Sequence, residues 1–260
     1  MANSFSGRTI AITGGCSGIG LATTQALLNA GATVYIADVL KAPQELEGKA
    51  NVHVNKCDIT SREACKTFID SIPGNLDGLV NCAGICPVEG KMASDELFER
   101  IMSINVTGSW YMGTEAIQRM TQQKQHSSEG LLPGSERTIG AGVIVNIASG
   151  ASLRGIAGLG AYCTSKHAVL GMTRSWAKEW PTLRVNAVAP GVTDTPLSRG
   201  ATSSTGDPED LKKLSSALSS RIPLGRMAYA TDIADVILFA LSDAASFMTG
   251  QVIPVNGGSD

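Results

Sequence analysis

The stretch Thr9-Ile-Ala-Ile-Thr-Gly-Gly-Cys-Ser-Gly-Ile-Gly20 decides the fold of this chain. Its first part, Thr9–Thr13, is β-branched or apolar throughout, as in a buried strand, and a helical pattern follows the turn. Between them, Gly14, Gly18 and Gly20 allow a tight turn, a close approach of backbone to ligand, and close packing of helix on strand. The free N–H groups at the start of such a helix attract phosphate oxygens. The pattern therefore predicts a strand–turn–helix unit that binds the pyrophosphate of a dinucleotide.

A carboxylate, Asp38, stands at the end of the next strand-like run, Thr33–Asp38. In this position an acid accepts hydrogen bonds from the ribose hydroxyls of the adenosine and repels a 2′-phosphate. No arginine or lysine lies in Gly15–Ser17 or at Val39 to neutralise such a phosphate. The alternative is an ordinary acid that caps a turn. With the glycine turn upstream, Asp38 favours NAD over NADP.

Strand-like and helix-like segments alternate along almost the whole chain. Short β-branched runs recur at Thr9–Thr13, Thr33–Asp38, Val52–Lys56, Leu79–Asn81, Val143–Ile147, Arg184–Ala189 and Val252–Val255. Helical periodicity marks Ile19–Ala30, Ser61–Ser71, Asp95–Met120, Ala161–Trp180 and Asp232–Ser242. Nearly continuous apolar strands are typical of a parallel sheet that helices cover on both faces. We predict an α/β fold with a doubly wound, seven-stranded parallel sheet, and one NAD-binding catalytic domain over residues 1–260.

Two segments interrupt this alternation. Gln122–Gly142 is polar and leads into the amino end of a strand, so we expect a surface insertion. Thr195–Gly225 follows the carboxyl end of a strand, the side on which ligands bind to open α/β sheets, and contains a predicted helix at Pro208–Ser219. We expect it to form a lid over the substrate site. A surface helix packed permanently on the body is the alternative.

Composition excludes several classes of protein. Of the 260 residues, 43% are hydrophobic and 17% charged, which suits a folded core, and the net charge of −2 includes no block of like charge. Neither nucleic acid nor an anionic membrane is therefore an expected partner. No run approaches the ~18 apolar residues of a membrane span, and the polar start of the chain does not resemble a secretory signal. We expect a cytoplasmic protein.

The cysteines indicate neither a metal site nor a redox motif. They are Cys16, Cys57, Cys65, Cys82, Cys86 and Cys163. No two form a C-x-x-C pair, and no closely spaced histidine pair completes a zinc site. We predict reduced thiols packed as small hydrophobic side chains, and no bound metal.

A tyrosine and a lysine with the spacing of one helical turn are the candidates for proton transfer. Tyr162 and Lys166 lie four residues apart, so both fall on one face of a helix. A phenol with a pKa near ~10 is a poor base at neutral pH, and a nearby ammonium group favours the phenolate. Ser149 follows the Val143–Ile147 strand, where its hydroxyl can hydrogen-bond a substrate oxygen. A tyrosine and a lysine four residues apart also occur by chance. The serine at the end of the preceding strand is what makes a catalytic role of the pair the better interpretation.

In these motifs the chain resembles the short-chain dehydrogenase/reductase family, over essentially its whole length. The matching pieces are Thr13-Gly-x3-Gly-x-Gly20, Cys57-Asp58, Asn81-Cys-Ala-Gly84, Asn105, Ser149, Tyr162-x3-Lys166 and Pro190-Gly191. Cys82 replaces an asparagine common in the family, and Asn256 stands where an aspartate is frequent. Neither departure removes a group needed for catalysis.

The resemblance implies a nicotinamide cofactor and assigns its contacts. Asp58 would bind the adenine, the segment Asn81–Gly84 would support the strand beside the cofactor, and Pro190–Thr195 would contact the nicotinamide end. With the glycine turn, the implied NAD site comprises Gly14, Ser17, Gly18, Ile19, Gly20, Asp38, Asp58, Ile59, Asn81, Ala83, Gly84, Tyr162, Lys166, Pro190, Gly191, Val192, Thr193 and Thr195.

The resemblance also assigns catalytic roles. Tyr162 would be the acid/base, Lys166 would lower its pKa and bind the nicotinamide ribose, and Ser149 would position the substrate. Asn105 would distort its helix and hold a water that links Lys166 to solvent. The expected reaction moves a hydride between NAD and a secondary alcohol or ketone. The alternatives are an epimerase or dehydratase that uses bound NAD internally, and a non-catalytic NAD-binding regulator. A regulator would be expected to have lost Tyr162 or Lys166.

Residues expected to face the substrate are mostly apolar. They are Ile85, Pro87, Val88, Ala151, Leu153, Ile156, Leu159 and Leu197, with Arg154 and Arg199 as surface exceptions. We therefore expect a small, lipophilic, cyclic substrate that resembles a steroid, terpenoid or polyketide.

Two long helices carry apolar residues on more than one face, which suggests self-association. These residues are Trp110, Met112, Ile117 and Met120 in Asp95–Met120, and Val169, Met172, Trp176 and Trp180 in Ala161–Trp180. One face of each helix must cover the sheet, and the remainder would be exposed in a monomer. The family resemblance implies that such faces pair in a homodimer or homotetramer.

Overall fold

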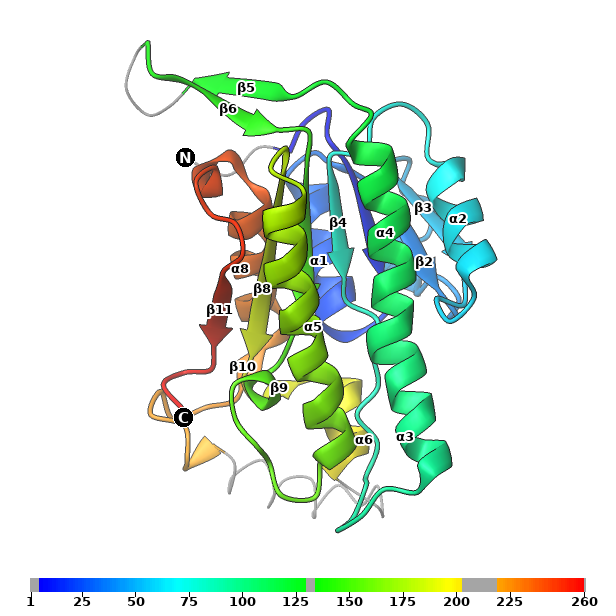
Figure 1. The fold of residues 1–260 in the computed structure, drawn as a ribbon, viewed down its shortest axis with the longest axis vertical. Helices are drawn as coiled ribbons and strands as arrows, with labels where there is room; N and C mark the ends of the chain where they lie inside the picture. The colour runs from blue at the N-terminus through cyan, green and yellow to red at the C-terminus, as the bar shows by residue number, and fades with distance from the viewer. Residues whose placement is uncertain (1–4, 130–133, 203–218, 260) are drawn as a thin grey trace.

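A seven-stranded parallel sheet forms the centre of the molecule, in a computed structural model that describes residues 5–129, 134–202 and 219–259 (Figure 1). Its strands are β1 (Thr9–Thr13), β2 (Thr33–Asp38), β3 (Val52–Lys56), β4 (Gly78–Asn81), β7 (Gly142–Ile147), β8 (Leu183–Pro190) and β11 (Val252–Val255). Their order is β11-β8-β7-β4-β1-β2-β3, so the chain reverses its direction of winding between β1 and β4. The predicted fold class is confirmed. Ligands bind beyond the carboxyl ends of the strands at such a switch point.

Helices cover both faces of this sheet. They are α1 (Gly18–Asn29), α2 (Arg62–Ser71), α3 (Asp95–Met102), α4 (Ser109–Met120), α5 (Gly160–Glu179), α6 (Pro196–Thr202) and α8 (Ala230–Leu241), with single turns η1 (Gln44–Leu46), η3 (Gly150–Ser152) and η4 (Asp243–Ala245). On one face, α1 and α8 bury Leu27 and Ile237 against Ile12 of β1. On the other, α2, α4 and α5 form a second apolar layer around the strands (Figure 1).

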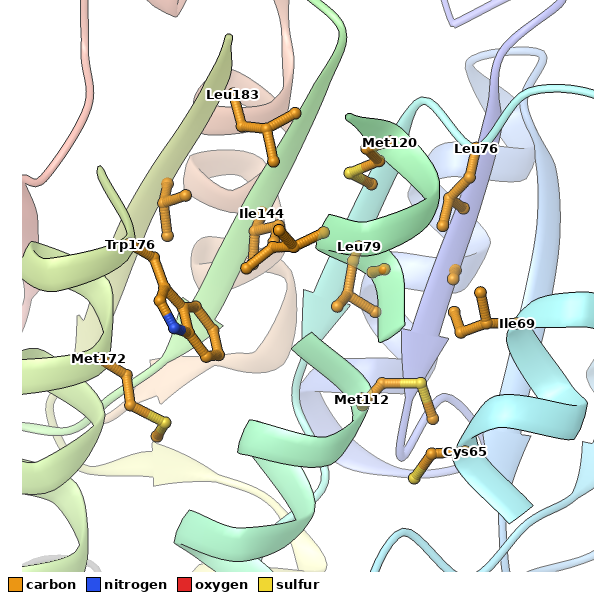
Figure 2. Packing of buried hydrophobic residues seen from close by; sticks show 14 of the residues in the cluster. Cys65, Ile69, Leu76, Leu79, Met112, Met120, Ile144, Met172, Trp176 and Leu183 are labelled. Carbon is orange, nitrogen blue, oxygen red and sulfur yellow. The ribbon is translucent and has the colours of Figure 1, made fainter. Parts of the chain in front are cut away.

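Most of the apolar side chains that the sequence analysis divides between the sheet and a partner are internal. Met112 and Trp176 are buried within the chain's own core, next to Leu79 and Ile144 of the sheet (Figure 2). The same holds for Ile117, Met120, Val169 and Met172. Of the eight apolar residues, only Trp110 and Trp180 remain exposed, at 43% and 38%. Most of the expected association surface is therefore internal packing.

The helix predicted over Asp95–Met120 is interrupted in its middle. A π-helical turn, η2 (Ser103–Gly108), separates α3 from α4 and contains the buried Asn105. π-turns of this kind are frequent at functional sites. The turn holds no proline and its glycine, Gly108, stands at its end, so the apolar pattern alone predicts one continuous helix, whereas the family resemblance predicts a distortion at Asn105.

The insertion at Gln122–Gly142 contains regular structure that its composition did not indicate. Strands β5 (His126–Glu129) and β6 (Glu136–Gly140) pair antiparallel and project from the end of the sheet opposite α6 (Figure 1). Burial alternates along both strands, but the residues are polar, so no hydrophobic period predicts them. No helix in the described part of the chain is long and apolar enough to span a bilayer.

Candidate active site

The glycine turn between β1 and α1 leaves no space for side chains. A Cβ on Gly20 would lie 2.0 Å from the carbonyl oxygen of Gly14, and one on Gly14 would lie 2.9 Å from Cα of Ala83. Gly14 and Gly18 also adopt positive φ angles of 70° and 51°. The Ser17 side chain makes no capping hydrogen bond at the start of α1, and the first turn of the helix holds no acid. An anion at this helix start would therefore meet no competing carboxylate, which agrees with the predicted pyrophosphate site.

Thr13, which the sequence analysis did not single out, ties this turn to the neighbouring strand end. Its buried hydroxyl oxygen accepts hydrogen bonds from the amides of Cys82 and Ala83, both at 3.0 Å. These bonds hold the segment after β4 next to the glycine turn. The predicted cofactor contacts Gly14 and Ala83 therefore lie together.

Asp38 lies at the carboxyl end of β2, and its carboxylate is buried beside the glycine turn. Oδ2 accepts a 2.9 Å hydrogen bond from the Cys16 amide, and Oδ1 accepts one of 2.9 Å from Leu40. Burial, and next the charge of Asp38, raise the pKa of the Cys16 thiol to about 12, so the thiol is neutral. The same carboxylate is the predicted acceptor for the ribose hydroxyls of the adenosine.

Two predicted cofactor contacts, Asp58 and Ile59, differ in their surroundings. Asp58 is exposed, with Oδ1 accepting bonds from the amide and hydroxyl of Thr60 at 2.9 and 2.8 Å. Ile59 is buried, and it lies so close to Gly108 that a Cβ on that glycine would be 2.6 Å from its side chain. The Asp58 carboxylate is therefore accessible to a ligand, whereas the Ile59 side chain belongs to the core.

The segment after β8 brings the predicted nicotinamide contacts back to the glycine turn. A Cβ on Gly18 would lie 3.5 Å from the side chain of Thr195, so the two face each other. Thr195 is buried and begins α6, where its hydroxyl accepts from the Ser198 amide at 3.4 Å. Thr193 donates to the carbonyl of Gly191 at 3.1 Å. Pro190, at the end of β8, and Val192 complete this predicted set.

The predicted catalytic residues converge beyond the ends of the central strands. Tyr162 lies in the first turn of α5 and is buried, and Ser149 directly precedes η3. Burial raises the pKa of the Tyr162 phenol above its ordinary value, and the nearby side chain of Ser149 opposes this. The sequence predicts these two hydroxyls on the same edge, and the structure places them near each other.

Lys166 is buried one helical turn further along α5. Its Nζ donates to the carbonyl of Ile147 at 2.8 Å and lies 5.8 Å from the centroid of the Tyr162 ring. Burial lowers the pKa of Lys166 to about 8. Gly84 lies beside this ammonium group, because a Cβ there would be 3.6 Å from Nζ, an ordinary contact distance. Because burial dominates the pKa of Tyr162, the lowering of that pKa by Lys166 stays a prediction.

Asn105 holds the segment after β4 through its side chain. Oδ1 accepts from the Ile85 amide at 2.8 Å, and Nδ2 donates to the Ile85 carbonyl at 2.9 Å and to Ser165 at 3.0 Å. The carboxamide therefore joins the π-turn to this segment and to α5. The predicted water-holding role stays a prediction, and it would fall to the backbone of the π-turn.

A second amide network supports the middle of the sheet. Asn81 donates to Oδ1 of Asn146 at 2.9 Å, and Asn146 donates to the hydroxyl of Thr173 at 2.9 Å. All three residues are buried. They link β4, β7 and α5 behind the catalytic residues, so Asn81 supports the site from within the core.

Glu89 was missed by sequence reasoning. Its buried carboxylate accepts hydrogen bonds from the amides of Ala161 and Tyr162, both at 2.8 Å. Two signals could have indicated it. The predicted helix begins after Leu159-Gly160, which supplies no capping side chain, and Glu89 is the only acid between Asn81 and Ser94.

The wall beside Tyr162 is apolar. Cys86, Ala151, Tyr162 and Cys163 form a buried cluster with Leu159 packed against it. Burial is the main cause that raises the pKa of Cys86, to about 11. Other residues expected to face the substrate are exposed, namely Val88, Leu153, Ile156 and Leu197. The predicted lid begins with α6, but its predicted helix at Pro208–Ser219 lies almost entirely outside the described residues.

Comparisons with known proteins agree on an oxidoreductase. Residues 14–260 match the family model described as enoyl-(acyl carrier protein) reductase. The chain is 35% identical to an uncharacterized oxidoreductase of Thermotoga maritima, covering 98% of both chains. It is 33% identical to cis-4-hydroxycyclohexanecarboxylate dehydrogenase of Sinomonas cyclohexanicum, covering 99% of this chain and 98% of that one. The crystal structure of levodione reductase matches with a TM-score of 0.85 at 30% identity, covering 98% of both chains.

Proposed function

The chain belongs to the short-chain dehydrogenase/reductase family, and from that premise we propose that it is an NAD(H)-dependent dehydrogenase of a secondary alcohol or ketone. One observation carries the proposal. The buried phenol of Tyr162 lies near the Ser149 side chain at the sheet edge where the glycine turn also lies, with Lys166 beside its ring. This places a proton donor and acceptor next to a dinucleotide-binding turn.

The residues around the glycine turn fit NAD. Gly14, Gly18 and Gly20 exclude side chains from the open start of α1, which would receive the pyrophosphate. Asp38 would accept the ribose hydroxyls, and its charge disfavours the 2′-phosphate of NADP. Thr195, facing Gly18, would hold the nicotinamide end. When bound, NAD supplies the group that accepts or donates the hydride.

The chain's own residues would carry the proton. During alcohol oxidation, Tyr162 Oη would take the proton from the substrate hydroxyl, and during ketone reduction it would return it. Ser149 would hold the substrate oxygen by a hydrogen bond. Lys166, held by the Ile147 carbonyl, would stabilise the phenolate form of Tyr162.

The wall of the site favours a lipophilic ring alcohol as substrate. The cluster around Cys86 and Cys163 is apolar, and Leu153 and Ile156 are exposed next to it. A six-membered ring that bears a hydroxyl is also part of the printed name of one relative, the dehydrogenase from Sinomonas cyclohexanicum. A flat apolar wall buries such a ring and leaves its hydroxyl to meet Ser149 and Tyr162.

A panel of alcohols tests this proposal. Cyclohexanol, menthol and a hydroxysteroid would be offered with NAD, and NADH formation followed by absorbance, with Tyr162→Phe as the control for background. We expect NADH with at least one ring alcohol and no NADH above background with the variant. If no member of the panel, nor the corresponding ketones with NADH, reacts, the proposed substrate class is wrong.

We further propose that the chain forms a homodimer or homotetramer through the outer surface of α4 and α5. Trp110 on α4 and Trp180 after α5 remain exposed, and the rings of Trp110 and Trp176 lie 5.5 Å apart. An exposed tryptophan on a long helix is typical of an association surface.

A further inference from the structure

We propose that Glu89 is a positioning residue, whose carboxylate holds the first turn of α5 and thereby sets the place of the Tyr162 phenol. The inference rests on the proposed role of Tyr162 as acid/base. Glu89 itself touches backbone, not the reacting atoms, so its effect would reach the reaction through the helix.

The start of α5 depends on this carboxylate because the helix supplies no cap of its own. Leu159 occupies the capping position, with φ −132° and ψ 41°, and its side chain offers no acceptor. First-turn amides have no acceptor within their helix. Glu89 Oε2 accepts from Ala161 and Oε1 from Tyr162, both at 2.8 Å, and all three residues are buried. Without Glu89 the amides of Ala161 and Tyr162 would lose these partners in a place with little access to water.

Glu89 reaches the helix from a segment that is itself fixed next to the site. At its start, the backbone of Ile85 is held on both sides by Asn105 of the π-turn. In its middle, Cys86 packs in the buried cluster that contains Tyr162. Directly after Glu89, the Gly90 carbonyl lies 3.3 Å from where a Cβ on Gly158 would be, so the segment also touches the chain before α5. The segment, the π-turn and α5 thus enclose Tyr162.

A glutamate suits this task better than its amide. Its two oxygens accept from two adjacent amides at once, and its negative charge meets the positive end of the helix dipole. Glutamine has the same size but only one acceptor oxygen, so its NH2 group would face one of the two amide donors. Glu89→Gln therefore keeps the packing and removes one hydrogen bond, whereas Glu89→Ala removes both.

Gln123 provides a matched control at the opposite edge of the sheet. Its side chain also satisfies the backbone of a distant segment, accepting from the Leu76 amide at 2.7 Å and donating to the Leu76 and Ala141 carbonyls at 3.0 Å each. Gln123→Ala therefore removes a comparable set of bonds far from Tyr162. A loss of fold stability alone would appear in both variants.

The test compares kcat with cofactor binding in the full chain, using NAD and the ring alcohol from the panel that reacts fastest. Misplacing a reacting group by about 1 Å can cost about a hundredfold in rate, so we expect Glu89→Ala to lower kcat by at least about 10-fold. The Kd for NADH, measured by its fluorescence, and the Kd for NAD, measured by calorimetry, should each change by less than about 2-fold, since the glycine turn is not touched. Glu89→Gln should fall between Glu89→Ala and the unmodified chain. Gln123→Ala should lower Tm and leave kcat unchanged.

Two outcomes would overturn the proposal. One is a kcat loss in Glu89→Ala no larger than in Gln123→Ala at a similar loss of Tm. The other, decisive if Glu89→Ala does not fold, is a normal kcat in Glu89→Gln. Amide hydrogen exchange needs no substrate. It therefore distinguishes failure of the proposed positioning role of Glu89 from failure of the proposed enzymatic function. We expect Glu89→Gln to speed exchange at Ala161 and Tyr162, whereas a Tyr162→Phe variant that retains full kcat would refute the acid/base role alone.

Discussion

The Asp38 carboxylate accepts a 2.9 Å hydrogen bond from the amide of Cys16, so the residue expected to select the cofactor also holds the glycine turn in place. A substitution of Asp38 therefore changes two properties at once. The charge opposes a 2′-phosphate, and the oxygens support the turn that would receive the pyrophosphate. An amide in place of the acid separates these effects, because it removes the charge and keeps one acceptor oxygen.

We expect the unmodified chain to prefer NAD over NADP by at least about 10-fold in kcat/KM, which corresponds to about 1.4 kcal/mol. Asp38→Asn should narrow this preference and largely retain activity with NAD. Asp38→Ala should narrow it too and also raise the KM for NAD, because the turn loses its support. Steady-state kinetics with NAD and with NADP measures this preference for the unmodified chain and both variants. Equal use of NAD and NADP by the unmodified chain would contradict the role of Asp38 in cofactor selection.

Removal of the Tyr162 hydroxyl should stop the chemistry and spare the cofactor. Tyr162→Phe should lower kcat by at least about 100-fold, the low end for general acid–base catalysis, with little change in the Kd for NAD. Ser149→Ala should lower kcat as well, because it removes the hydroxyl that would hold the substrate oxygen and that opposes the rise in the pKa of Tyr162. Normal turnover by Tyr162→Phe would show that another group transfers the proton.

The raised pKa of Tyr162 gives the two directions of the reaction different pH profiles. Burial favours the neutral phenol, so its deprotonated form, needed to accept a proton from an alcohol, gains population as the pH rises. We expect kcat/KM for oxidation to increase between about pH 7 and 10, and kcat/KM for ketone reduction to stay level over the same range, because the phenol remains protonated there. Profiles that rise together would exclude Tyr162 as the titrating group.

Much of this site was predictable because parallel strands that are covered by helices on both faces have nearly continuous apolar sequences. The strand at Val143–Ile147 was found to within one residue, and the rule that carboxyl ends share an edge placed Ser149 beside Tyr162. These inferences need only local patterns and one topological rule.

The parts that were not predictable depend on contacts between distant segments. Glu89 caps a helix whose first turn lies 72 and 73 residues further along the chain, whereas capping rules examine only the neighbours of a helix. The pattern before and after the π-turn around Asn105 remains helical, so only the family resemblance indicated a distortion there. The sequence did not reveal which apolar residues of α4 and α5 are internal, so it did not separate Met112 and Trp176 from the exposed Trp110 and Trp180.

Self-association through the outer surface of α4 and α5 should depend on Trp110. Light scattering at micromolar concentration should give a particle that is a multiple of the 27.0 kDa chain. Trp110→Glu should shift it toward the monomer, because a charge there is poorly tolerated in an interface core. Circular dichroism of the variant controls for folding. A monomeric unmodified chain would rule out this surface.

Lys166 should make the chain more stable at alkaline pH than at neutral pH. Its pKa is lowered from 10.5 to about 8 in the folded chain by burial, so between these values the unfolded state binds more protons and stability rises with pH. Below about pH 8 the buried charge costs up to about 3 kcal/mol, at 1.36 kcal/mol per pKa unit. Lys166→Met should therefore unfold with a free energy that rises less between about pH 8 and 10. Denaturant titrations at both pH values measure the free energy of unfolding. An equal increase of this free energy between the two pH values in Lys166→Met and in the unmodified chain would contradict the prediction.

The contact between α4 and α5 should tolerate no side chain at Gly113. A Cβ there would lie 2.4 Å from the Trp176 ring, and Trp176 is fully surrounded by core residues and cannot move aside. Gly113→Ala should lower the free energy of unfolding by about 1–3 kcal/mol, as overpacking usually does. Gly171 on α5 is the matched control, because a Cβ there would meet nothing within 4 Å. Gly171→Ala should raise stability by up to about 1 kcal/mol, since alanine favours a helix over glycine. Urea titration of both variants decides the matter: if Gly113→Ala were as stable as the unmodified chain, α4 and α5 could not be packed as closely as the ring of Trp176 indicates.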